Sequence, residues 1–198
     1  INGAIKQQVN MQINTSLTIS ADNVGGQINY YASHSDRSTL TLTGGTLNYN
    51  VYSPSSTAYG NTVIAGAVDA QSYYVGGWVT INSGASLKVR ADRMYNGWTG
   101  DYRIVNNGTL YLGTNTNADF STGNFVRYVE GSGNIVFTGD IRNTSAYGAM
   151  IRNPVTINSG VTYQGNANVF YQPVTNNGIM KFTAATSYAQ APISVTLS

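Results

Sequence analysis

The chain has 198 residues, of which 41% are hydrophobic, and this is enough for one domain with a buried core. Asn, Thr, Ser and Gly together account for more than two fifths of the chain, whereas Lys, Glu and Leu are scarce, which excludes a mainly helical fold. Charged residues make up 9% and the net charge is +2, which excludes a protein that grips duplex nucleic acid through many phosphate contacts.

A strand–turn–strand pattern recurs along the chain, with glycine in each turn. From Gly84 to Gly178 the turn glycines recur at intervals of roughly 18–27 residues, which is typical of one coil of a β-solenoid. The longer gap from Gly45 to Gly84 divides into two similar intervals if Gly66 marks a degenerate copy. In chain order, the copies occupy residues 40–49, 64–68, 79–89, 104–112, 129–137, 155–163 and 174–182.

Apolar and polar residues alternate within these strands, as in Leu87-Lys88-Val89. Alternation sends every second side chain inward, and Gly and Asn tolerate the backbone angles of a corner. We therefore predict an all-β fold, a single parallel β-helix over residues 1–198 with roughly eight coils of 18–27 residues and atypical capping coils at both ends. The alternative is an antiparallel sandwich, because Asn-Gly is also a strong hairpin signal.

Charge and aromatic rings are concentrated between Lys88 and Arg103, a short segment that holds a third of the chain's charged side chains, most of them basic. An aromatic ring can stack on the CH face of a sugar, and arginine donates paired hydrogen bonds to carboxylate or sulfate. The alternative is loop packing with internal charge pairing. The candidate ligand-binding residues are Arg90, Arg93, Tyr95, Trp98, Tyr102 and Arg103, extended by Tyr74 and Trp78 one coil earlier.

The motifs at residues 78–89 and 105–112 resemble the pectate-lyase-like adhesive domains of Gram-positive, especially lactobacillus-type, surface proteins. The likeness is strongest over residues 78–182. The resemblance implies a right-handed parallel β-helix that is a fragment of a larger protein on the bacterial cell surface. There the domain would mediate adhesion or aggregation. Passenger domains of autotransporters and phage tail proteins use similar Asn-Asn-Gly-Thr-Leu rungs, so either origin stays an alternative.

The sequence offers little for catalysis or metal binding. It has no Cys, one His, His34, and only one Glu with seven Asp, so no dense set of metal ligands is expected. Two copies of Thr-Gly-Asp-x-Arg, at residues 99–103 and 138–142, are interpreted as a neutralising surface ladder on stacked strands. We expect neither enzymatic activity nor a cofactor, with polysaccharide lysis as the less favoured reading.

The expected partner is an extracellular glycan or glycoprotein, anionic in one version of the hypothesis, with self-association as the alternative. No apolar run approaches the roughly 20 residues that span a bilayer, so membrane insertion is not expected. Binding is expected to strengthen in acid, because carboxylates lose charge near pH 4 while basic residues keep theirs. We also expect four tyrosines to stack between coils: Tyr30, Tyr31, Tyr147 and Tyr171.

Overall fold

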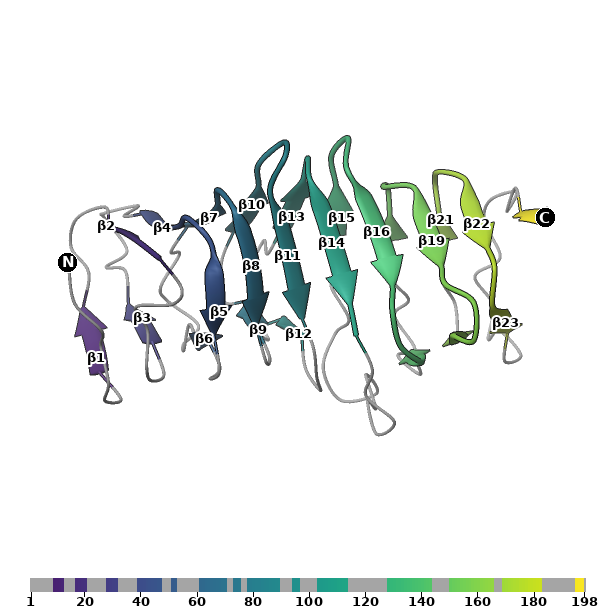
Figure 1. The fold of residues 1–198 in the computed structure, drawn as a ribbon, viewed down its shortest axis with the longest axis horizontal. Coiled ribbons are helices and arrows are strands. Elements are labelled where there is room, and N and C mark those ends of the chain that lie inside the picture. Colours follow the sequence, from purple (N-terminus) through teal and green to yellow (C-terminus); the bar gives the residue numbers. More distant parts are fainter. Residues whose placement is uncertain are drawn as a thin grey trace.

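The computed structural model is an elongated stack of short β-strands with the two termini at opposite ends (Figure 1). It describes residues 9–12, 17–20, 28–31, 39–47, 51–52, 61–70, 73–75, 78–89, 94–96, 103–113, 128–143, 150–165, 169–182 and 195–197. Every strand pairing among these residues is parallel and links strands of successive coils. The chain is thus an all-β solenoid of stacked coils, and the antiparallel sandwich is wrong.

Two eight-stranded sheets form the long sides of the stack. The front sheet faces the viewer in Figure 1, and the back sheet lies behind it. The front sheet contains β5 (Gly45–Leu47), β8 (Ala67–Ala70), β11 (Ser86–Val89), β14 (Thr109–Leu112), β16 (Asn134–Phe137), β19 (Val155–Ile157), β22 (Val174–Asn176) and β24 (Val195–Leu197). The back sheet contains β2 (Leu17–Ile19), β4 (Thr39–Leu42), β7 (Asn61–Ile64), β10 (Trp78–Ile81), β13 (Arg103–Asn106), β15 (Tyr128–Glu130), β18 (Met150–Ile151) and β21 (Val169–Phe170).

Two smaller sheets lie along the lower edge in Figure 1. The N-terminal base sheet contains β1 (Val9–Gln12), β3 (Ile28–Tyr31), β6 (Val51–Tyr52), β9 (Tyr73–Val75) and β12 (Met94–Asn96). The C-terminal base sheet contains β17 (Ile141–Asn143), β20 (Thr162–Gly165) and β23 (Ile179–Phe182). A coil therefore runs from a back strand to a front strand and then through a base strand to the next back strand.

The predicted alternation is confirmed in the strands. Leu87 and Val89 are buried and Lys88 between them is exposed, while Leu110 and Leu112 are buried with a half-buried Tyr111 between them. Burying an aliphatic side chain stabilises the fold by roughly 1.5–3 kcal/mol, and here the gain recurs in each coil. The inward residues form one continuous apolar core along the stack.

Aromatic side chains from three sheets meet in the C-terminal part of this core. The ring of Tyr163 stacks on that of Phe137, with centroids 5.3 Å apart and planes 8° from parallel, and meets Phe170 edge-on at 5.7 Å. These rings come from β20, β16 and β21, in the C-terminal base, front and back sheets respectively. The cluster therefore joins the three sheets through the core.

The sequence motif does not keep to one corner of the coil, which corrects the predicted alignment. Residues 79–89, 104–112 and 129–137 turn from the back sheet to the front sheet. In the copies at residues 155–163 and 174–182, however, the first strand pairs in the front sheet and the second in the C-terminal base sheet. The interval from Gly133 to Gly160 is therefore not one coil.

Register partners give the true coil lengths. The coil from Thr62 to its partner Val79 is among the shortest that the structure describes, and the next coil, from Val79 to its partner Ile104, is among the longest. The coil lengths predicted from the glycine intervals are therefore slightly too long at both ends of their range. Gly66 does lie in a turn, as the degenerate copy predicted. This turn connects β7 of the back sheet to β8 of the front sheet, and each of these strands pairs with its counterpart on the preceding coil.

The same pair of stacked turns occurs at the back-to-front corner and at the front-to-base corner. The Asn-Ser-Gly turns end at Gly84 and Gly160, both with φ of 77°, a conformation that favours glycine. In each case an Asn-Asn-Gly turn lies on the next coil, and a Cβ added to its glycine, Gly108 or Gly178, would collide with backbone oxygens of the turn beneath. Backbone bonds repeat as well: Thr109 N–H donates to Ala85 at 3.0 Å, and Ile179 N–H to Val161 at 2.9 Å.

A buried asparagine closes the back-to-front corner further along the stack. Asn153 is fully buried, and its Nδ2 donates to the carbonyl oxygens of Asn106, Gly131 and Gly133 at 2.9–3.1 Å. Asn106 is also fully buried and donates to the carbonyl of Asn134 at 2.9 Å. These side chains add hydrogen bonds to the backbone carbonyls of the corner, where the strand ladders end.

The two kinds of turn glycine predict different costs of substitution. Gly84→Ala meets no atom within 4 Å and strains only the backbone angle, which costs about 1 kcal/mol. Gly108→Ala drives a methyl group into the backbone of the coil below and should cost about 3 kcal/mol, as for overpacking. Urea unfolding followed by circular dichroism measures both changes. A Gly84→Ala loss equal to or above that of Gly108→Ala would contradict the stacked-turn geometry.

Candidate functional site

The backbone register aligns four of the predicted ligand-binding residues in two pairs. Tyr74 of β9 is the partner of Tyr95 of β12 in the N-terminal base sheet, and Trp78 of β10 is the partner of Arg103 of β13 in the back sheet. β9 is followed directly along the chain by β10, and β12 by β13. The two pairs therefore flank the same base-to-back corner on successive coils.

The positions of Trp78 and Arg103 fall on the outer face of the back sheet. Val79 and Ile104, the next residues along, are buried, and residues alternate between the two faces of a strand. The other predicted residues, Arg90, Arg93, Trp98 and Tyr102, lie outside the described residues, as does His34. Ligand binding by this set stays a prediction.

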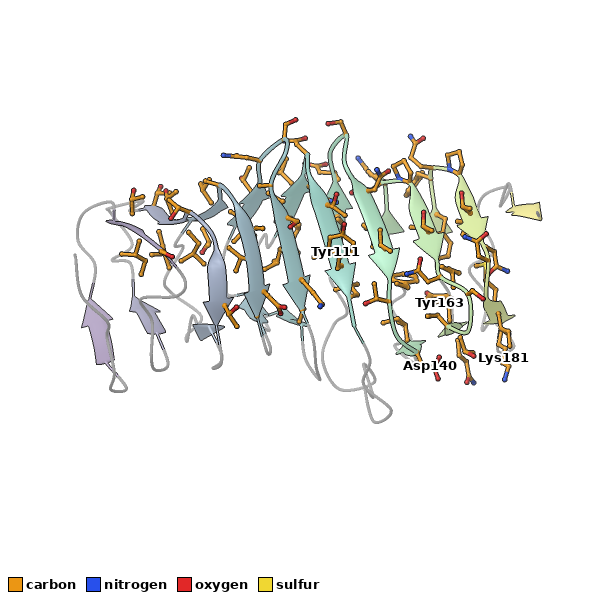
Figure 2. The ribbon with its side chains drawn as sticks, in the orientation of Figure 1. Tyr111, Asp140, Tyr163 and Lys181 are labelled. Carbon is orange, nitrogen blue, oxygen red and sulfur yellow. The ribbon has the colours of Figure 1, made fainter. Side chains whose placement is uncertain are left out.

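A column of side chains runs along the outer face of the front sheet, one from each coil. Neighbours in this outer column are register partners, so they stand about 4.8 Å apart. Figure 2 shows Tyr111 on this face, midway along the stack. In order, the outer column contains Thr46, Asp69, Lys88, Tyr111, Val136, Thr156 and Thr175.

Lys88 and Tyr111 form the centre of the candidate site. The Nζ atom of Lys88 lies 3.6 Å from Oδ2 of Asp69 on one side, and Tyr111 occupies the register position on the other. Ser86 and Thr109, also register partners, lie on the same face two positions upstream and add small hydroxyl side chains. An ammonium, a carboxylate, hydroxyls and a phenol ring are thus presented together on a flat surface.

The Lys88–Asp69 pair contributes little to stability. The two side chains are 48% and 36% exposed, so water screens their attraction, and such surface pairs contribute about 0–1 kcal/mol. The pair places the ammonium group near the Asp69 carboxylate on the preceding coil, while Tyr111 occupies the register position on the following coil. Polar groups at fixed positions next to an aromatic ring suit a ligand with both hydroxyls and an apolar face.

A second cross-coil contact lies on the back-sheet side. Arg152 is 3.9 Å from Glu130 on the preceding coil and places its guanidinium carbon 5.3 Å from the ring centre of Tyr171 on the following coil. Tyr171 is predicted to stack between coils, and its ring packs against the guanidinium of Arg152 on the preceding coil. Of the other three tyrosines, Tyr30 and Tyr31 have only their backbones described, and Tyr147 lies outside the described residues.

The two Thr-Gly-Asp-x-Arg copies do not form the predicted ladder. Arg103 belongs to β13 in the back sheet, whereas Arg142 belongs to β17 in the C-terminal base sheet, where its register partner is Gln164. The two arginines of the motif therefore lie in different sheets and cannot belong to one ladder. Asp140 instead accepts a hydrogen bond from the backbone N–H of Thr162 at 2.7 Å.

Sequence reasoning placed Tyr111 on the outside but did not include it in the site. The alternation at residues 109–112 showed its orientation, yet it did not show which residue lies beside it. That neighbour depends on the exact offset between β11 and β14, which the interval from Gly84 to Gly108 approximates but does not equal.

Comparisons with known proteins give no further information on the site. No protein-family model matches the chain, and comparisons with curated proteins and with solved structures find no match. Within the described ranges, no group of three His, Cys, Asp or Glu residues is placed to hold a metal ion. The same part of the chain contains no helix with the length and hydropathy of a membrane span.

The register around the base-to-back corner can be tested with spin labels, because the chain has no cysteine of its own. Nitroxides attached at Tyr74→Cys and Tyr95→Cys should show strong dipolar broadening, since the labelled positions are one strand spacing, about 4.8 Å, apart. Labels at Tyr74→Cys and Arg103→Cys, which lie in different sheets, are the control. Equal spectra from the two pairs would contradict the register.

Proposed function

We propose that the chain is a non-enzymatic adhesin domain of the bacterial cell surface that binds extracellular glycans or glycoproteins through outward aromatic and basic side chains. The observation that carries the proposal is the contiguous set Asp69, Lys88 and Tyr111 on the outer face of the front sheet. The paired positions Tyr74–Tyr95 and Trp78–Arg103 support it, because they gather further aromatic and basic residues on the same coils.

The chemistry of the front face suits a sugar. A pyranose has one face of C–H groups, which packs on an aromatic ring, and a rim of hydroxyls that hydrogen-bond to charged and hydroxyl side chains. Each such contact is weak. A cell surface carries many copies of both partners, so that modest single-site affinity gives firm attachment.

The proposal includes the architecture that would present such sites. We propose one domain, a right-handed solenoid of roughly eight coils, with capping coils at the ends. Right-handed winding is favoured because a strand that crosses over to a parallel neighbour does so with that hand in nearly all proteins. The likeness of the rungs at residues 78–89 and 105–112 to lactobacillus-type adhesive domains supports the surface location.

Substitution of the central ring tests the front-face site. Tyr111→Ala should weaken glycan binding about fivefold, because stacking on an aromatic ring contributes about 1 kcal/mol, whereas Tyr111→Phe keeps the ring and should bind nearly as well. Affinity for ligands found on a glycan array can be measured by biolayer interferometry. Unchanged binding by Tyr111→Ala would remove the front face from the proposal.

The predicted corner site has its own variant. A combined Arg90→Ala, Arg93→Ala and Trp98→Ala chain should lose more than tenfold in affinity if these residues contact the ligand, since several charge-assisted and stacking contacts disappear together. If only the front-face variant weakens binding, the site is confined to the outer column. If neither does, the front face and the corner are both removed from the proposal.

Acid pH separates glycan binding from self-association. As the pH falls from 7 to 4, the eight acidic residues of the chain lose roughly half of their charge while its ten Lys and Arg side chains stay charged, so attraction to anionic glycans should grow. Light scattering should show a monomer throughout this range. Oligomers that grow with protein concentration would support the aggregation hypothesis instead.

A further inference from the structure

The C-terminal base sheet has an outer face that the proposed function does not use. Ile141 and Tyr163 of this sheet are buried, so the residues that alternate with them fall on the outer face. Figure 2 shows Asp140 and Lys181 at this lower edge, and Tyr163 above them within the stack. Strand register organises the face into two columns.

In the first column an arginine, a glutamine and a lysine occupy successive register positions. Arg142 is the register partner of Gln164, and Gln164 is the register partner of Lys181. Lys181 is exposed and Gln164 is half-buried. Because adjacent strands are about 4.8 Å apart, the two basic positions stand about 10 Å apart with the amide halfway between them.

The second column lies beside the first. It contains Asp140, Thr162 and Ile179, two positions upstream along the chain. Ile179 is 50% exposed, so an apolar surface adjoins Lys181. Among the described residues, neither Asp140 nor Lys181 forms an ion pair, and Asp140 is instead held by the Thr162 N–H.

We propose that this face binds an acidic polysaccharide that carries one carboxylate on every second sugar, laid along the solenoid axis. Its two carboxylates meet the basic residues Arg142 and Lys181, and the neutral sugar between them faces the Gln164 amide. The amide both donates and accepts hydrogen bonds, as sugar hydroxyls do. The apolar face of a sugar packs on Ile179.

The spacing of charges determines the choice of ligand. A polymer with a carboxylate on every sugar would place an anionic group opposite Gln164 and crowd further negative charge beside Asp140, which costs energy. An uncharged polymer would gain nothing from the two basic positions. This site is separate from the front-face site, and its test does not depend on that site.

Hyaluronan oligosaccharides are the probe, because they carry one carboxylate per disaccharide. Calorimetric titration at low salt should show binding that Arg142→Gln and Lys181→Gln each weaken about fivefold, the size expected for one exposed charge contact. Binding to polygalacturonate, charged on every sugar, should be weaker, and binding to dextran absent. Arg142→Gln and Lys181→Gln should leave unchanged the affinity for an uncharged glycan whose binding Tyr111→Ala weakens, which distinguishes this site from the front-face site.

Arg152→Gln is the matched control, since it removes the same unit of charge from a half-exposed side chain that already contacts Glu130 and Tyr171. It should change the affinity less than twofold. The proposal is overturned if hyaluronan does not bind, if Arg152→Gln weakens binding as much as Lys181→Gln, or if single-stranded DNA binds equally well and with the same variant pattern. Melting curves of the variants verify that each is folded.

Discussion

The structure depends on the parallel, in-register pairing of each coil with the next. Each strand of the three walls exchanges backbone hydrogen bonds with its counterparts on neighbouring coils, and the ladder continues through the corners, as where Asn107 N–H donates to Ile81 at 2.9 Å. Register fixes which side chains are neighbours on both faces. A slip of one position would send Leu87 outward and Lys88 into the core, so the apolar interior and the pattern of the outer surface are set together.

Much of the wall structure could be predicted from the sequence, because the signals for it lie within single strands and turns. Alternation in Leu87-Lys88-Val89 identifies inside and outside without knowledge of the rest of the chain, and glycine marks the turns. Which corner a turn occupies is not local information. The Asn-Ser-Gly turn at Gly84 and that at Gly160 have the same backbone angle, yet one leads to the front sheet and the other to the C-terminal base sheet.

The candidate sites were harder to predict for the same reason. The pairing of Tyr74 with Tyr95 agrees with the expectation that residues one coil apart lie side by side. The neighbours of Arg142 depended instead on the correct corner, and the assumed alignment with Arg103 hid Gln164 and Lys181. Spacing within a repeat predicts side-chain orientation, while adjacency across coils requires the length of each coil, and this length changes from one coil to the next.

The outer column contributes a single side chain per coil, and this has an evolutionary consequence. Because Lys88 and Tyr111 project from strands whose buried neighbours form the core, either can be exchanged with little effect on folding. The residues of the outer column can therefore be substituted independently of the core. Specificity for a new ligand can be acquired through single substitutions, without an intermediate that fails to fold.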